Sequence, residues 1–168
     1  MVLAVPVSTP SELYAHALAI EREAAERYAE FAQRMADEGN DQVATLFRTL
    51  AVFEAEHLET LEARTKGVDL PRIAPGEYAW LDAGAPETAA HDLVFRLLTP
   101  HQALEIALEA ERRAKQFFTE VKETATDPAL RALAQEMAME EQGHIAMVQL
   151  TLERTPAGKV DWGRVFGD

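Results

Sequence analysis

The sequence predicts an all-α fold, an antiparallel four-helix bundle made of two helical hairpins joined by a long crossover. Three observations predict it. The composition is 48% hydrophobic, 27% charged and only 7% aromatic, with alanine, leucine, glutamate and arginine prominent, which favours helix over sheet. Apolar residues recur at helical spacing in four long segments. The segments of the first half also repeat in the second half, which indicates two copies of one hairpin.

The first and third helices begin with the same type of capping motif. Thr-Pro-Ser-Glu starts at Thr9, and Thr-Pro-His-Gln starts at Thr99, 90 positions later. In each motif threonine is a good N-cap, proline suits the first helical position, and Glu or Gln can reach back to the cap. An apolar stripe at helical spacing follows both caps. We therefore predict helices over residues 10–38 and 100–125.

The second and fourth helices also begin at capping residues and correspond to each other. Gly39 ends one helix and Asn40 caps the next, while Asp127, followed by proline, caps the fourth. Matching residues of these two helices lie 87 positions apart, so the first hairpin turn is three residues longer than the second. We predict these helices over residues 41–66 and 128–154.

The remaining segments connect or flank the two copies within a single domain, residues 1–168. Proline and glycine between the halves indicate a connection, with a short helix near residues 87–98. If a pseudo-twofold axis relates the hairpins, we expect the first and third helices to run parallel and the connection to cross the length of the bundle. The predicted division is repeat one at 9–66, crossover at 67–98, repeat two at 99–154 and a C-terminal tail at 155–168.

Six residues interrupt the apolar stripes at positions that correspond between the two copies. A lone glutamate lies in the middle of the first and third helices, among alanines and leucines. The second and fourth helices each carry Glu-x-x-His, whose side chains lie on one side of a helix, close enough to bind one ion. One such motif is weak evidence, but two at equivalent positions indicate a metal site. The predicted ligands are Glu21, Glu54, His57, Glu111, Glu141 and His144.

Four ionised carboxylates inside one bundle would destabilise the fold if they had no partners. Burying even one unpaired charge costs several kcal/mol, and like charges within a few ångströms add to that cost. Two divalent ions would balance the four negative charges, with the histidines bound as neutral imidazoles. We therefore predict that the cluster holds two metal ions.

A glutamate from each of two helices, with Glu-x-x-His from each of two others, is the pattern of di-iron and di-manganese carboxylate proteins. Over residues 9–154 the chain resembles the rubrerythrin family of the ferritin-like superfamily. The resemblance implies two iron ions, with manganese or zinc as possible substitutes. It implies that Glu21 and Glu111 are terminal ligands and that each histidine binds one ion. Glu54 and Glu141 would bridge the ions and take part in catalysis.

Three more positions bear on this resemblance. Tyr28 lies two turns after Glu21, where the family commonly keeps a tyrosine near the iron. Its hydroxyl could hydrogen-bond a ligand carboxylate across the bundle, so we expect a catalytic role, with aromatic core packing as the alternative. Phe118 fills the matching place without a hydroxyl, which indicates two unequal metals. Ala114 stands where rubrerythrins often carry an extra glutamate, and this difference weakens the peroxidase assignment.

The resemblance implies a non-haem di-iron oxidoreductase, a rubrerythrin-like peroxidase that reduces hydrogen peroxide or dioxygen. Rubrerythrins proper take electrons through a rubredoxin domain with four cysteines. This chain has no cysteine, so we expect a separate donor such as a rubredoxin. A ferroxidase or iron-binding protein of iron handling is the first alternative, and a non-catalytic four-helix interaction protein is the second. We expect a homodimer, since the family usually forms dimers or larger assemblies.

The charge and composition exclude several classes of protein. A formal net charge of −13 disfavours binding to nucleic acid. Without cysteine, these residues cannot form disulfides, zinc-thiolate sites or iron–sulfur clusters. No apolar run is long enough to span a membrane, and the N-terminal stretch lacks the features of a signal peptide. We expect no membrane partner and a cytoplasmic location.

Other candidate residues are predicted to lie off the metal face. Glu109 is about 200° around the helix from Glu111 and points outward, and Glu140, about 100° from Glu141, lies at the rim or surface. His16, His91 and His101 are predicted not to be ligands. Four methionines at core spacing are predicted to pack in the interior, and two tryptophans to bury against the bundle or a partner: Met35, Met137, Met139, Met147, Trp80 and Trp162.

Overall fold

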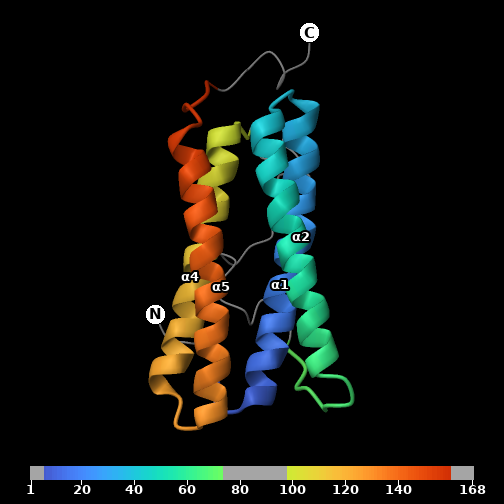
Figure 1. Cartoon of the computed structure of the whole chain (residues 1–168), viewed down its shortest axis with the longest axis vertical. Helices are drawn as coiled ribbons and strands as arrows, with labels where there is room; N and C mark the ends of the chain where they lie inside the picture. The colour runs from blue at the N-terminus through green and yellow to red at the C-terminus, as the bar shows by residue number, and fades with distance from the viewer. Residues whose placement is uncertain (1–5, 74–97, 160–168) are drawn as a thin grey trace.

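The computed structural model describes residues 6–73 and 98–159 and places most of them in four long helices (Figure 1). These are α1 (Pro10–Asp37), α2 (Asp41–Arg64), α4 (Pro100–Thr124) and α5 (Pro128–Glu153). The all-α prediction is confirmed, and each predicted helix starts at the observed residue and ends within two residues of the observed end. None of the described helices combines the length and hydropathy needed to cross a membrane.

The helices begin where a side chain can accept a hydrogen bond from the first free backbone N–H groups. Thr9 and Thr99 each accept from the residue three positions on, whose own side chain accepts from the N–H of the threonine. Asn40 and Asp127 cap α2 and α5 with their side-chain oxygens. Gly39, between α1 and α2, has a φ of 77°, a left-handed conformation that costs glycine little.

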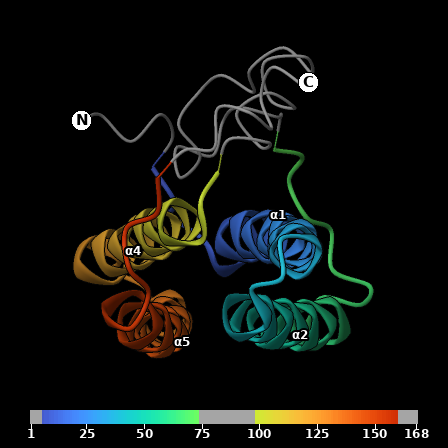
Figure 2. The same ribbon diagram turned by 90° about the horizontal axis from the view of Figure 1, so that it is seen from above.

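The bundle consists of two hairpins that lie side by side. Viewed along the helix axes, α1 and α4 form one layer, and α2 and α5 form the other (Figure 2). α1 packs mainly against α2, and α4 packs mainly against α5. The predicted four-helix bundle of two hairpins is therefore confirmed.

The direction of the third long helix differs from the prediction. In Figure 1, α1 runs upward and α4 runs downward, so these helices are antiparallel rather than parallel. The pseudo-twofold axis is therefore perpendicular to the helices and turns one hairpin end over end onto the other. The antiparallel direction is what makes the predicted crossing necessary, because α2 ends at the lower end of the bundle and α4 begins at the upper end. An α4 parallel to α1 would begin at the end where α2 finishes and would need no crossing.

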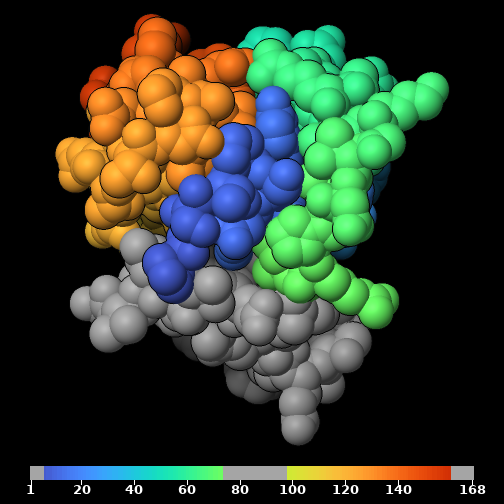
Figure 3. All heavy atoms as spheres, turned by 90° about the horizontal axis from the view of Figure 1, so that it is seen from below, coloured from blue at the N-terminus to red at the C-terminus, as the bar shows by residue number. Residues whose placement is uncertain are grey.

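The lower end of the bundle displays this end-over-end arrangement directly. Figure 3 shows the start of α1 between the turn that joins α4 to α5 and the C-terminal end of α2 with the residues that follow it. The hairpin turn of the second copy thus lies at the end where the first copy begins. Corresponding mid-helix residues of the two copies are consequently brought to the same level of the bundle.

The core is built from corresponding residues of the two copies. Among the largest fully buried side chains are Tyr28 and Phe47 in the first hairpin and Phe118 in the second. Burying one aromatic or large aliphatic side chain contributes about 1.5–3 kcal/mol. Smaller residues, such as Ala24 and Ala114, line the middle of the bundle, where the four glutamates lie.

One of the core predictions is wrong. Met35 and Met137 are buried as predicted, whereas Met139 is 65% exposed. Met139 lies two residues before Glu141, and this step of about 200° turns its side chain to the outer face of α5. Some predictions fall wholly or mainly outside the described residues: the short helix near 87–98, most of the C-terminal tail, His91, Trp80 and Trp162.

Candidate metal centre

All four predicted glutamates are buried in the middle of the bundle, one on each helix. Each lies on the apolar stripe that its helix buries, so the packing of that stripe carries a carboxylate into the interior. His144 is 4% exposed, while the His57 side chain, at 25%, lies nearer the surface. The exposed fraction of each glutamate is between 1% and 3%: Glu21 on α1, Glu54 on α2, Glu111 on α4 and Glu141 on α5.

His144 is surrounded by three carboxylates at distances suited to one metal ion. Its Nδ1 lies 3.0 Å from Glu54 Oε1, 3.4 Å from Glu111 Oε2 and 3.6 Å from Glu141 Oε2. Two atoms bound to one ion at about 2.1 Å are at most about 4.2 Å apart. These four residues, which come from α2, α4 and α5, can therefore offer their ligand atoms to a single ion.

His57 faces a second group of possible ligands. Its Nδ1 lies 3.7 Å from Glu21 Oε2, and its ring is nearly parallel to that of His144, with 5.5 Å between the centroids. Glu54, His57 and His144 form another group with ligand atoms close enough to hold an ion. Glu54 and His144 both belong to the two groups, and of these Glu54, whose carboxylate has two oxygen atoms, is the one suited to be shared between two ions.

The residues present fit a metal ion, and Glu21 provides the clearest sign of it. Both of its carboxylate oxygens are buried, and neither has a hydrogen-bond partner among the described residues. The nearby nitrogen, His57 Nδ1, is too far away for a hydrogen bond and also lacks a partner there. A buried carboxylate without donors is costly, and a cation between Glu21 and His57 would satisfy both groups. Carboxylate and imidazole ligands suit iron, manganese and zinc.

The electrostatics of the metal-free cluster favour proton uptake. Burial raises the pKa of Glu54 and of Glu141 well above the usual carboxyl range. Burial alone would lower the pKa of His144, but the three carboxylates around its Nδ1 outweigh this effect and raise the pKa. Burial also acts to raise the pKa of Glu111, but His144 and the Tyr28 hydroxyl outweigh burial and lower this pKa. Protons and metal ions would therefore compete for the same atoms.

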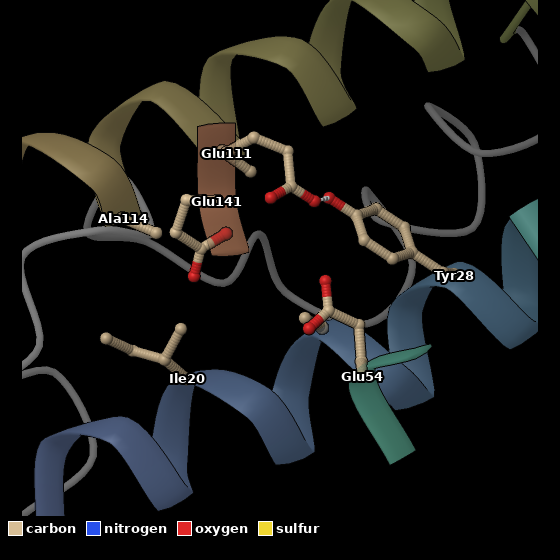
Figure 4. Close-up of a pocket in the computed structure, with 8 residues that line it drawn as sticks. Ile20, Tyr28, Glu54, Glu111, Ala114 and Glu141 are labelled. Carbon is tan, nitrogen blue, oxygen red and sulfur yellow. Dashed lines mark hydrogen bonds between the residues drawn. The ribbon is translucent and has the colours of Figure 1, made fainter. Parts of the chain in front are cut away.

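Tyr28 makes the predicted hydrogen bond across the bundle. Its hydroxyl, on α1, donates to Glu111 Oε1 on α4 (Figure 4). Burial and the adjacent carboxylates raise the pKa of Tyr28 well above its usual value, so the hydroxyl keeps its proton. The Tyr28 ring contacts Phe47, with 5.8 Å between the centroids, which helps to hold the hydroxyl in place. The hydrogen-bonding prediction is confirmed, while a catalytic role for Tyr28 stays a prediction.

A small cavity adjoins three of the carboxylates. Figure 4 shows Glu54, Glu111 and Glu141 pointing toward a common space beside Tyr28. The space is large enough for about one water-sized molecule. The arrangement can therefore bring a small molecule next to ions held by these carboxylates. The full lining is Ile20, Ala24, Tyr28, Glu54, Ala110, Glu111, Ala114 and Glu141.

Sequence reasoning missed two residues that contact the histidines. The Phe53 ring stacks on His144, with 6.3 Å between the centroids and 10° between the planes, although Phe53 is 38% exposed. Glu140, placed at the rim by prediction, is indeed half-buried, but its Oε2 lies 3.8 Å from His57 Nδ1. Their positions in the sequence could have indicated these contacts, since each residue directly precedes a predicted ligand glutamate.

Several residues predicted not to be ligands lie away from the cluster. Glu109 is exposed and pairs with Arg113 along α4. His16 packs against the Phe117 ring, at 5.3 Å between centroids. His101 Nδ1 is 2.8 Å from the carbonyl oxygen of Thr155, which ties the start of α4 to the end of α5. These contacts explain the three side chains without a metal.

Comparison with known proteins agrees with this arrangement. The sequence model described as "Rubrerythrin" matches residues 12–152, a range that includes all six predicted ligands. A search of curated proteins gave no match. The chain is similar to a solved structure, an uncharacterized conserved protein from Magnetospirillum magnetotacticum MS-1, with 32% identity and a TM-score of 0.79. That similarity covers 90% of this chain and 99% of the other. Since the family match spans most of its length, the chain belongs to the rubrerythrin family.

Proposed function

We propose that the protein is a non-haem di-iron oxidoreductase that reduces hydrogen peroxide or dioxygen with electrons from a separate donor protein. The observation that carries this proposal is the set of four buried carboxylates and two histidines in the middle of the bundle, with three of the carboxylates lining a cavity for about one water-sized molecule. Glu21, Glu111 and the two histidines would hold the ions individually. Glu54 and Glu141 would lie between them.

The protein's own contribution is to keep two cations close together in the middle of a largely apolar bundle core. When bound, two ferrous ions supply one electron each and Lewis acidity. Four carboxylates balance four positive charges, so neutral ligand sets can be buried together. Glu111 is oriented by the Tyr28 hydroxyl, which limits the geometries that this carboxylate can adopt. Such support from outside the ligand set is expected to preserve the spacing of the ions through turnover.

The cavity favours a small oxidant. Its walls include alanine side chains and the ring of Tyr28, and they leave space for about one water-sized molecule and none for an organic substrate. Reduction of hydrogen peroxide to two waters consumes two electrons and two protons. Tyr28 and the cluster carboxylates are the groups placed to hold or pass those protons. The donor protein then returns two electrons to the centre.

The donor is proposed to be an external protein such as a rubredoxin, because these 168 residues contain no cysteine for a protein-bound iron–sulfur centre. Manganese or zinc would fit the same ligands, so the metal must be identified on protein purified without oxygen. A homodimer is also proposed, and sedimentation of the iron-loaded protein tests it.

The test is peroxide consumption coupled to NADH oxidation through a rubredoxin reductase and a rubredoxin. Iron-loaded wild type should turn over, and Glu54→Ala should reduce the rate to the level without protein. Glu59→Ala, at an exposed position of α2, is the matched control and should keep the wild-type rate. Circular dichroism and iron content separate loss of chemistry from loss of folding or metal. A wild-type rate no higher than that of Glu54→Ala would refute the peroxidase proposal.

One observation favours a second function, the oxidation of ferrous iron for iron handling. Ala114 lines the cavity at 2% exposure, where rubrerythrins often carry an extra glutamate. A ferroxidase would oxidise added ferrous iron with dioxygen or peroxide in the absence of any donor protein, and would retain or release ferric iron. Donor-independent oxidation of many iron equivalents per chain, without donor-linked peroxide consumption, would favour this alternative.

A further inference from the structure

The internal repeat pairs Phe53 with Glu140, the residues that directly precede the two ligand glutamates of α2 and α5. The spacing of 87 positions relates Phe53 to Glu140 just as it relates His57 to His144. Because the hairpins are related by the pseudo-twofold axis, each of these residues approaches the histidine of the other hairpin. Phe53 approaches His144, and Glu140 approaches His57. The two corresponding positions thus place an aromatic ring on one side of the centre and a carboxylate on the other.

Glu140 reaches the metal-facing side of His57. Its Oε2 lies 3.8 Å from His57 Nδ1, and Nδ1 is also the atom that faces Glu21 Oε2 at 3.7 Å. Each separation by itself is below the limit of about 4.2 Å for two atoms that bind one ion. Glu21, His57 and Glu140 do not yet form a group with all ligand atoms within 4.8 Å of one another, so the Glu140 carboxylate has to move toward Glu21 when an ion binds. The side chain of Glu140 is 30% exposed, so it can adjust its position without unpacking the core.

A second observation on the same side points to a cation. Glu21 is 1% exposed, and both of its oxygens lack a hydrogen-bond partner among the described residues. Its counterpart Glu111 accepts from the Tyr28 hydroxyl, whereas the residue that corresponds to Tyr28 is Phe118, which has no hydroxyl to offer. The buried carboxylate of Glu21 is therefore left for a metal ion to satisfy.

We propose that Glu140 is a seventh metal ligand, which completes with Glu21 and His57 the half of the centre that lies nearer the surface. This inference rests on the proposed metal centre and adds to it a carboxylate outside the six residues of the repeated motifs. It makes the two metal positions unequal. The ion beside His57 gains a partly exposed carboxylate, and the ion beside His144 is covered by the Phe53 ring instead.

The alternative is that Glu140 only accepts a hydrogen bond from His57 and so orients it. A double-mutant cycle distinguishes the two roles. Glu140→Gln is made in the wild type and in His57→Ala, and Co²⁺ binding is measured by calorimetry and by the visible absorption of the bound ion. Glu59→Gln, on the exposed face of α2, is the matched loss of one acidic charge. Circular dichroism of each metal-free variant checks the fold.

If Glu140 binds the ion, Glu140→Gln should weaken one of two Co²⁺ sites by about 10–100-fold and leave the other unchanged. The same substitution should weaken that site again in the His57→Ala background. Glu59→Gln should bind like the wild type. An effect of Glu140→Gln that disappears in His57→Ala would overturn the proposal, as would two sites of unchanged affinity. Wild type that binds no Co²⁺ would instead remove the proposed metal centre itself.

Discussion

The two halves of the candidate centre use the same backbone positions and have different surroundings. In the His144 half, formed by Glu111 and His144, the carboxylate accepts from Tyr28 and the imidazole is covered by Phe53. In the His57 half, formed by Glu21 and His57, the carboxylate oxygens lack hydrogen-bond partners among the described residues, and the imidazole is partly exposed. Glu54 belongs to both groups of possible ligands, while Glu141 belongs to the group around His144.

The difference teaches that a repeated ligand motif does not produce equivalent metal positions. In the His144 half the Glu111 carboxylate is oriented before metal binds by the Tyr28 hydroxyl, and the His144 ring by its stacking on Phe53, although His144 Nδ1, like His57 Nδ1, has no hydrogen-bond partner among the described residues. The His57 half depends on an ion to satisfy its buried carboxylate. We therefore expect the two sites to differ in affinity, in exchange rate and in their response to mutation. The following predictions test this contrast in order of decreasing effect.

The largest effect should come from metal removal, and it should depend on pH. In the metal-free protein, the raised pKa values of Glu54 and Glu141 mean that the folded state binds protons that the unfolded chain releases. Stability should therefore fall as pH rises above the ordinary carboxyl value of 4.5. The raised pKa of His144 acts in the same direction above 6.5, because its stabilising charge is lost as pH rises through the folded pKa.

Metal binding should have the opposite pH dependence, since the ligands bind in their deprotonated forms. The difference in melting temperature between metal-loaded and metal-free protein should widen from pH 5.5 to pH 8. Differential scanning calorimetry at both pH values, with and without a chelator, measures it. A constant difference, or one that narrows with rising pH, would contradict the assignment of these groups as a charge-balanced metal centre.

Replacing the terminal glutamates should change metal-free stability in opposite directions. Glu111→Leu removes the acceptor of Tyr28 and a partner of His144, and should destabilise the metal-free protein by about 1–3 kcal/mol. Glu21→Leu removes a buried carboxylate without hydrogen-bond partners in the described structure, and should stabilise it by about 1–4 kcal/mol. Urea unfolding in chelator measures both, with Glu109→Leu as a surface control. Changes of the same sign would break the contrast between the halves.

Moving the tyrosine hydroxyl from position 28 to position 118 should transfer a hydrogen bond from Glu111 to Glu21. Tyr28→Phe leaves Glu111 without its donor and should cost about 1–2 kcal/mol of metal-free stability. Phe118→Tyr places a hydroxyl at the corresponding position, where it should donate to Glu21 and recover part of the loss in the double variant. Urea unfolding of the two single variants and the double variant tests this. Strictly additive losses, with no recovery, would show that Phe118 cannot take the equivalent role.

The smallest effect should follow removal of the ring that covers His144. Phe53→Ala should lower stability by only about 1 kcal/mol, because the ring is partly exposed and the stacked pair is a modest interaction. It should also speed metal release from the His144 half, measured by transfer of bound Co²⁺ to a chelator. Val52→Ala, also on an exposed part of α2, is the control. Release that is unchanged in Phe53→Ala would show that the ring does not protect this half.

Much of the fold and the convergence of the ligand residues could be predicted from the sequence. Helix starts were predictable because the caps at Thr9 and Thr99 are local interactions that leave a local pattern. The cluster was predictable because a glutamate on an apolar stripe must be buried with it. The direction of α4 was predicted wrongly, because a repeat is the same for either orientation of the symmetry axis, whereas a connection that crosses the bundle is compatible only with an α4 antiparallel to α1.

Contacts between the two hairpins could not be predicted from the angular positions of residues around their own helices. Glu140 lies about 100° from Glu141, so its own helix places it only at the rim. Its proximity to His57 depends on how closely α5 approaches α2, which no residue of α5 determines alone. The same reasoning applies to Phe53 and His144, whereas Tyr28 was predicted because the family resemblance pointed to its position.

The covalent link between the two hairpins has a consequence for how this centre can vary. A hairpin of this kind, paired with an identical copy about a true twofold axis, would present every side chain twice. Any tyrosine gained beside one ion would then also appear beside the other. Joining both hairpins in a single chain frees each position to change alone, as the pairs Tyr28/Phe118 and Phe53/Glu140 demonstrate. The surroundings of the two ions can therefore differ in this protein, whereas they would have to be identical in a symmetric homodimer of chains half as long.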